Sequence, residues 1–249
     1  MKKYFALTAL SIALSGCGGS GGGGAGGGDA GGNQNSATNA AEGIWSGSFT
    51  EKNKNTTSLA FVVLETGEFW GAQVTEATKS GGVMHGKIQT SDGTFTSSMR
   101  MYFSDKDTIS TPALNGNFKS KISFNFTGSE PLQTTYNDAY ETQASLSSLA
   151  GIYNGFAMSK NRQGFDIDVN IDNKGNIIGG NVDLCGVTGQ ATPRKSGKNV
   201  FDVTLKAQGP ECPSGTSSTA GIGILLGDEL TLLTENSANN NVIGFSGNK

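Results

Sequence analysis

Apolar and polar residues alternate one by one along several short segments of this chain. Between residues 165 and 172, every second residue is apolar and the residues between them are Asp or Asn. This period of two places the apolar side chains on one face of a β-strand. Similar apolar spacing recurs in the second half at residues 201–205 and 230–232, and the counterparts in the first half are the predicted strands at 59–64, 99–103 and 122–126.

Turn-forming residues separate the predicted strands. Asp172-Asn173-Lys174-Gly175 ends the clearest alternating segment, and its glycine can adopt a positive φ. Evenly spaced short strands with glycine-rich turns predict an all-β fold of antiparallel barrel or sandwich type. A barrel would also leave no strand edge exposed to aggregation.

A pentapeptide in the first half recurs in the second half at an offset of 108 residues. Gly43-Ile44-Trp45-Ser46-Gly47 corresponds to Gly151-Ile152-Tyr153-Asn154-Gly155. We therefore predict a duplicated module of about 100 residues, a size at which one core is self-sufficient. The same offset maps Gly67 onto Gly175 and Gly71 onto Gly179, and further on the register drifts, so that Gly86 matches Gly189, Phe95 matches Phe201, and Gly116 matches Gly221.

The duplication predicts two tandem antiparallel β-barrel or sandwich domains of similar fold, at residues 43–128 and 149–249. Between them, residues 129–148 form a predicted linker. Its part from 136 onward contains neither Gly nor Pro and includes Ala139, Glu141 and Leu146, which favour a helix. The linker is therefore expected to hold one short helix or turn.

Residues 1–16 have the layout of a secretory signal peptide. A short positive region, Met1-Lys2-Lys3, precedes an apolar stretch over residues 4–14. This stretch is too short to span a bilayer as a transmembrane helix. A signal peptide of a soluble exported protein and an N-terminal core helix are the alternative interpretations.

The tetrapeptide Leu14-Ser15-Gly16-Cys17 resembles the lipobox of bacterial lipoproteins. The resemblance implies cleavage before Cys17, a diacylglycerol on its thiol, and a third acyl chain (palmitate) on the new amine. Several acyl chains together give a stable membrane anchor. In enteric bacteria an Asp after the cysteine retains lipoproteins in the inner membrane. Because Gly18 stands there, the resemblance implies the outer membrane.

A glycine-rich tether follows the predicted lipid anchor at residues 17–42. Eleven of the fifteen residues from 18 to 32 are glycine, and glycine loses the most backbone entropy on ordering. A P-loop would need a Gly-Lys-Ser/Thr ending, which is absent. About 25 residues of such coil reach roughly 28 Å, enough to hold the folded domains away from the membrane surface.

The charge of the chain gives no sign of a nucleic-acid partner. Of 18 Lys and Arg, Lys2 and Lys3 leave with the signal, so 16 remain against 21 Asp and Glu. A nucleic-acid-binding surface needs a basic patch or stripe, and no run of basic residues is present. No further segment of 18 apolar residues occurs, so the lipid is the only membrane attachment that we predict.

Two cysteines remain once Cys17 carries lipid. Cys185 and Cys212 would lie in an oxidising exported compartment, where a disulfide between them is the expected state. Metal binding is the alternative, but two thiols without a nearby His are an incomplete ligand set for zinc.

Residues suited to catalysis or metal binding are few. His85 is the only histidine, and we interpret it as an exposed or capped loop residue rather than a general base or metal ligand. The sequence contains no His-Glu-x-x-His motif. A carboxylate pair formed only in space stays open. We therefore predict no catalytic residue and no cofactor.

One short segment has the spacing of a calcium-binding loop. Asp168-x-Asn170-x-Asp172 imitates the start of an EF-hand, but its sixth position is Asn173 instead of Gly and its twelfth is Gly179 instead of Glu. These residues also occupy the polar face of an alternating strand. We therefore expect them to be solvated and predict no metal site.

Two family resemblances concern the repeated opening motif. Gly43-x-Trp45 resembles the Gly-x-Trp of lipocalins, although Tyr153 takes the tryptophan's place in the second copy. The Gly-x-Tyr-x-Gly opening, on a two-domain lipoprotein with a glycine-rich anchor, is similar to the barrel domains of transferrin-binding protein B-like surface lipoproteins. This resemblance implies binding rather than catalysis. Trp45, Trp70 and Tyr153 are expected to plug the barrel cores.

These observations together favour a non-enzymatic binding or accessory module, lipid-anchored in the outer membrane on its periplasmic side or at the cell surface. Its partner would be an envelope protein or a small ligand. An envelope enzyme with a carboxylate site and a structural spacer are the alternative functions.

Substitution of Cys17 by Ala tests the lipid anchor. Because the acyl chains would be the membrane attachment, the variant should move from the membrane fraction to the soluble fraction on cell fractionation. A Cys17→Ala protein that still sediments with membranes after a salt wash would contradict the lipobox interpretation.

Overall fold

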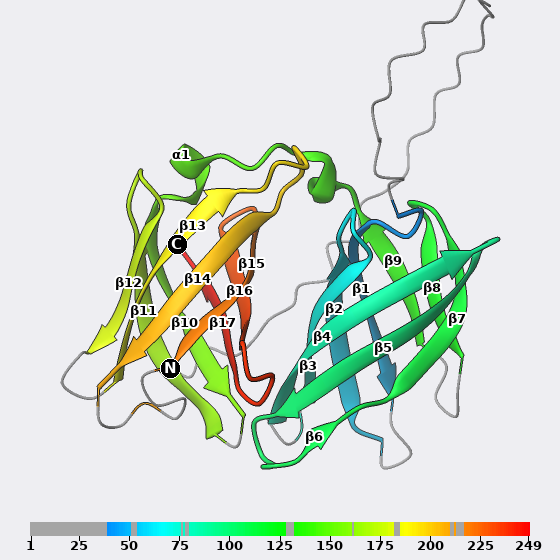
Figure 1. Cartoon of the computed structure of the whole chain (residues 1–249), viewed down its shortest axis with the longest axis horizontal. Helices are drawn as coiled ribbons and strands as arrows, with labels where there is room; N and C mark the ends of the chain where they lie inside the picture. The colour runs from blue at the N-terminus through cyan, green and yellow to red at the C-terminus, as the bar shows by residue number, and fades with distance from the viewer. Residues whose placement is uncertain are drawn as a thin grey trace, which may run out of the picture.

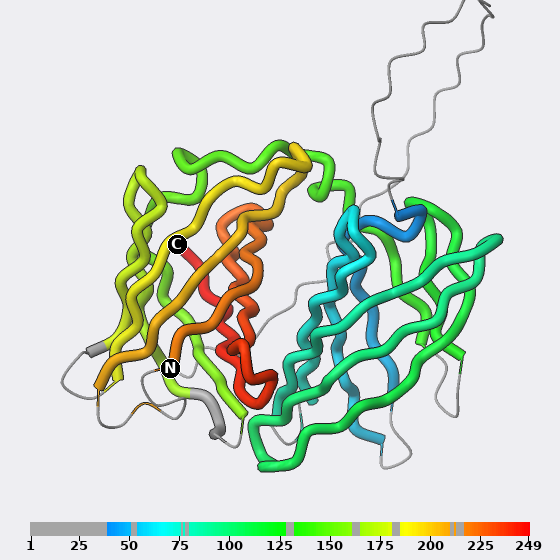
Figure 2. Tube along the Cα trace, in the orientation of Figure 1, coloured from blue at the N-terminus to red at the C-terminus, as the bar shows by residue number. Residues whose placement is uncertain are grey.

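The computed structural model describes residues 39–50, 54–75, 77, 80–127, 132–160, 162–181, 185–209, 212 and 217–249. In this part of the chain, two closed eight-stranded antiparallel barrels follow one another in sequence (Figure 1). The predicted all-β fold with two similar domains is confirmed, and both domains are barrels rather than sandwiches. Each barrel is built from one continuous half of the chain (Figure 2).

The first barrel closes when its last strand pairs with its first. Trp45 lies opposite Tyr136 in this closing ladder. A two-residue strand, β6 (Ile109–Ser110), extends the sheet beside the far end of β5. The barrel strands are β1 (Gly43–Thr50), β2 (Thr56–Val63), β3 (Glu68–Thr75), β4 (Ser80–Ser91), β5 (Thr94–Phe103), β7 (Ala113–Lys119), β8 (Ser123–Thr127) and β9 (Leu132–Asn137).

The second barrel repeats this layout strand for strand. It closes through β10 and β17, with Gly155 opposite Gly247. Its strands are β10 (Gly151–Ser159), β11 (Arg162–Ile171), β12 (Asn176–Asn181), β13 (Cys185–Pro193), β14 (Phe201–Gln208), β15 (Ser218–Leu226), β16 (Glu229–Asn236) and β17 (Val242–Asn248).

The connection between the barrels differs from the sequence-based expectation. The first domain extends beyond residue 128, because β9 is needed to close its barrel against β1. The predicted linker at 129–148 therefore contains a strand and only two short helical turns, η1 (Asp138–Glu141) and α1 (Leu146–Leu149). Asn137 ends β9 and accepts a hydrogen bond from the Ala139 amide (3.0 Å), which starts the first turn.

Equivalent glycines adopt the same turn conformation in both copies. Gly67 and Gly175 adopt φ of +76° and +81°, and their carbonyls accept hydrogen bonds from Ile88 (2.7 Å) and Ala191 (2.8 Å). This left-handed conformation favours glycine. The predicted correspondence of Gly116 with Gly221 is shifted: the ladders place Gly116 opposite Phe95 and Gly223 opposite Phe201.

An aromatic side chain closes the same end of each barrel. The Trp45 indole donates to the Ala41 carbonyl (3.0 Å), and the Tyr153 hydroxyl donates to the Leu149 carbonyl (2.5 Å). Both rings are fully buried, and burial raises the pKa of Tyr153 to about 12. Trp45 and Tyr153 are thus core plugs as predicted. Trp70 is buried too, but in a cluster shared by the outer faces of both barrels.

Cys185 and Cys212 lie at disulfide-bonding distance, with their Cα atoms 4.6 Å apart. Cys185 starts β13, and Cys212 follows β14, so the bond ties the connection after β14 to the neighbouring strand. Closing a loop with a sequence separation of 27 residues should contribute roughly 3 kcal/mol on the chain-entropy account. The disulfide between Cys185 and Cys212 agrees with the prediction from the sequence.

Candidate functional site

The outer faces of the two barrels bury one shared apolar cluster. Strands β3 and β4 of the first barrel face the β16–β17 hairpin of the second (Figure 1). An apolar interface of this kind holds two domains in a fixed orientation. Its buried members are Ile44, Val62, Leu64, Trp70, Val83, Tyr102 and Tyr140 from the first half, and Met158, Val200, Ile222, Ile224, Leu233 and Val242 from the second.

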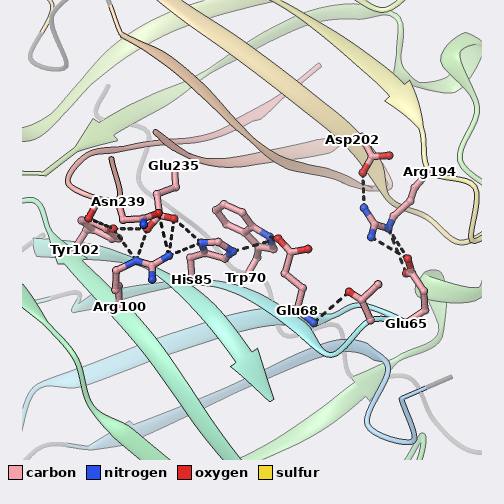
Figure 3. Close-up of polar contacts among 11 residues, drawn as sticks. Glu65, Glu68, Trp70, His85, Arg100, Tyr102, Arg194, Asp202, Glu235 and Asn239 are labelled. Atoms are coloured by element: carbon pink, nitrogen blue, oxygen red, sulfur yellow. Dashed lines mark hydrogen bonds and ion pairs between the residues drawn. The ribbon is translucent and has the colours of Figure 1, made fainter. Parts of the chain in front are cut away.

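A single carboxylate from the second barrel lies at the polar centre of this interface. The Glu235 side chain is only 4% exposed and points from β16 toward the first barrel (Figure 3). Arg100 donates to both of its oxygens, from Nε and from Nη2, each at 2.7 Å. The Tyr102 hydroxyl also donates to it. The bidentate charged pair is the strong form of hydrogen bonding that a buried carboxylate requires.

His85 extends the network to a second carboxylate. Its Nδ1 lies 2.7 Å from Glu235 and its Nε2 lies 3.1 Å from Glu68. Both ring nitrogens can donate only in the imidazolium form. The ring stacks on Trp70 with centroids 3.7 Å apart, and an aromatic face attracts a cation. The indole nitrogen of Trp70 in turn donates to Glu68 (2.8 Å).

The pKa values of these groups reflect competition between burial and pairing. Burial alone would lower the pKa of His85, but its hydrogen bonds to Glu235 and Glu68 outweigh burial and raise the pKa. Burial alone would raise the pKa of Glu235, yet hydrogen bonds from His85, Arg100 and Tyr102 lower it to about 2. The interface therefore favours an imidazolium beside two carboxylates.

A second polar link joins the barrels near the linker. Arg194 of the second barrel donates from Nε to Glu65 of the first (2.9 Å), and its Nη1 lies 2.5 Å from Asp202 (Figure 3). The Arg194 side chain is largely buried, whereas its partners Glu65 and Asp202 are 25% and 50% exposed. Together with the Glu235 network, this bridge fixes the interface at two separated points.

The interior of the second barrel contains an apolar cavity of about 30 Å³. It lies at the end that carries the disulfide, opposite the Tyr153 plug. None of the described residues that line it is charged. The lining residues are Ala157, Met158, Ser159, Phe165, Ile167, Val169, Ile177, Cys185, Val187, Leu205, Ala207, Leu232, Ile243 and Phe245.

The cavity arises because aromatic residues of the first barrel are aliphatic in the second. In the first barrel, the ring of Phe61 packs against Phe69 and Phe126, with centroids 5.1 Å and 5.5 Å away. The strand registers place Val169, Ile177 and Leu232 at these three positions in the second barrel. All three line the cavity. Smaller side chains on the same strand layout leave space that the rings fill in the first copy.

The structure describes some of the residues that the sequence analysis singled out and not others. Cys17 and the signal segment lie outside the described residues. His85 is not an exposed loop residue as expected: it lies within β4, half-buried between the barrels, because Glu235 and Glu68 compensate its charge. The sequence offers no sign of this pairing, since His85 and Glu235 are 150 residues apart.

The calcium-like segment is used for a turn. Asp168 and Asn170 are exposed on the outer face of β11. Asp172 accepts hydrogen bonds from the amides of Lys174 (2.8 Å) and Asn176 (2.9 Å), which shapes the hairpin to β12. These bonds, led by those from Asn176, lower the pKa of Asp172. Within the described ranges, no group of three or more His, Cys, Asp or Glu side chains could hold a metal ion.

Substitution of Glu235 by Gln tests the interface network. The amide leaves Arg100 and His85 without their buried carboxylate, so the free energy of unfolding should fall by about 3 kcal/mol. Chemical denaturation measures this change. The control Asp168→Asn, on an exposed face of the same barrel, should change stability by less than about 0.5 kcal/mol. Equal effects of the two substitutions would contradict the assigned role of Glu235.

The raised pKa of His85 predicts a specific pH dependence. The contribution of His85 to the free energy of unfolding is fully present below its pKa of 6.5 in the unfolded chain. This contribution is lost as the pH rises through the higher pKa of His85 in the folded protein. Wild-type stability should therefore decline from about pH 6.5 toward pH 9, whereas His85→Gln should lack this decline. Because His85 is the only histidine, parallel pH profiles of the two proteins would show that it does not titrate in the interface.

No helix in the described residues has the length and apolar character needed to cross a membrane. Comparison of the whole chain with protein-family models, with curated proteins and with solved structures finds no match.

Proposed function

We propose that this protein is a lipid-anchored, non-enzymatic binding module of the bacterial envelope, with its ligand site inside the second barrel. The observation that carries the proposal is the apolar cavity in the second barrel at positions where the first barrel is filled by phenylalanines. The ligand class that suits this site is a small, predominantly apolar molecule.

The chemistry of the cavity supports binding. Val169, Ile177 and Leu232 form part of an almost entirely aliphatic and aromatic wall. Transfer of an apolar molecule from water into such a space is favourable because apolar surface leaves water. Small-molecule sites are typically lined by apolar side chains with few polar groups, and the lining of this cavity has that composition.

The disulfide supports the same assignment. Cys185 lines the cavity and is joined to Cys212 beyond the end of β14. The bond therefore reinforces the barrel end at which the aromatic filling is missing. A wall that is held in place loses less entropy when a ligand binds.

The non-enzymatic part of the proposal rests on the contacts that the reactive side chains make. The one histidine of the chain is bonded at both ring nitrogens. Glu235, its partner, accepts from three side chains. These groups serve the interface between the barrels, whereas the cavity lies inside the second barrel.

The membrane anchor gives this binding module its place in the cell. The lipobox resemblance at Cys17 implies the outer membrane, and the glycine-rich segment up to residue 42 provides a reach of roughly 28 Å. Both barrels would be carried together on one tether, since their interface holds them as a pair.

Substitution of Ile177 by Phe tests the ligand site. The larger ring restores the side chain found at Phe69 and fills the cavity, so binding of toluene should weaken more than about tenfold. Methyl NMR titration of the isotope-labelled protein with toluene measures the affinity. Folding should be retained, because a ring occupies the same strand position in the first barrel.

The matched control is Ile178→Phe, one residue further along the same strand. Ile178 is 61% exposed on the outer surface, so its substitution should leave toluene binding unchanged. If wild-type protein shows no saturable toluene binding, or if Ile177→Phe binds as well as Ile178→Phe, the second barrel is not the ligand site.

A further inference from the structure

We infer that the cavity of the second barrel takes a compact, neutral ligand with an apolar body and a single hydroxyl or carbonyl group, which hydrogen-bonds to Ser159. This inference rests on the proposed function and specifies the ligand class of the same site. The observation behind it is a buried polar atom in an otherwise apolar wall.

Ser159 is the polar group in question. The residue is 5% exposed and lines the cavity. Its hydroxyl oxygen is buried and has no hydrogen-bond partner in the described part of the chain. Buried polar side chains nearly always have a partner, because an unsatisfied one retains the full cost of leaving water. A ligand group that pairs with Ser159 would remove this cost.

Regular alternation along β10 accounts for the position of Ser159. Tyr153, Ala157 and Ser159 occupy alternate positions of the strand and are all buried. The ladder with β17 runs through Ser159 without a shift. The ladder with β11 shifts register here, because β10 advances by two residues while β11 advances by three, so the extra residue belongs to β11.

The described part of the wall suits a neutral ligand. None of the described residues that line the cavity carries an ionisable group, apart from the disulfide-bonded Cys185. A carboxylate or an ammonium group would lose its hydration without an opposite charge nearby. A serine hydroxyl can donate and accept, so it suits a neutral hydroxyl or carbonyl.

Met158 gives the site room to adapt. It lines the cavity and also belongs to the cluster between the barrels. Its Cε lies so close to Gly81 of the first barrel that a Cβ there would be 2.8 Å away. A flexible thioether can repack around ligands of different shape. The first barrel thus backs one wall of the site.

Toluene and phenol test the inference, because they have nearly the same shape and differ by a methyl and a hydroxyl group. Their affinities are measured by methyl NMR titration for the wild type, for Ser159→Ala, and for the control Ser218→Ala on the exposed side of β15. Ser159→Ala should weaken phenol binding roughly tenfold and leave toluene binding within about twofold. Ser218→Ala should change neither affinity.

The outcomes separate this inference from the proposed function. Toluene binding to Ser159→Ala shows that the variant is folded and that the cavity is intact. If toluene binds but phenol affinity is the same with and without Ser159, the inference is wrong, and a water molecule is the partner of the hydroxyl. If neither molecule binds to the wild type, the proposed function fails together with the inference.

Discussion

The buried carboxylate of Glu235 is the constraint on which the arrangement of the two barrels depends. A carboxylate that is 4% exposed is tolerated only when charged donors surround it closely. All of these donors come from the other barrel: Arg100, Tyr102 and His85 reach it from β4 and β5. Separation or rotation of the barrels would leave Glu235 unpaired. The apolar cluster around the network supplies the buried surface, and the network selects one orientation.

The two copies have opposite specialisations on their inner and outer surfaces. Ile44 and Trp70 of the first barrel are 4% and 2% exposed against the second barrel, whereas Ile152 and Ile178, at the same repeat positions, are 58% and 61% exposed. Inside the barrels the relation is reversed, because the aromatic filling of the first copy is replaced by smaller side chains around the cavity of the second. The same module thus provides a docking face in one copy and an apolar cavity in the other.

The sequence predicts the barrels better than it predicts what joins them. Strict alternation along residues 165–172 and the 108-residue repeat are enough for the strands and the duplication. β9 is missed because residues 132–137 contain Thr and Gln in place of apolar alternation. Residues 59–64 are apolar without interruption, which is typical of a strand buried on both faces, and this signal could have revealed the interface. The Glu235 network forms across 150 residues, so local patterns contain no trace of it.

Xenon binding in crystals tests most directly the claim that the second barrel holds a ligand cavity at positions where aromatic side chains fill the first barrel. Xenon enters dry apolar cavities and has strong scattering. Crystals of the mature protein under xenon pressure should show one site within the second barrel, bounded by Val169, Ile177 and Leu232, and none within the aromatic core of the first. Xenon in both barrels, or in neither, would contradict the division of roles between the two copies.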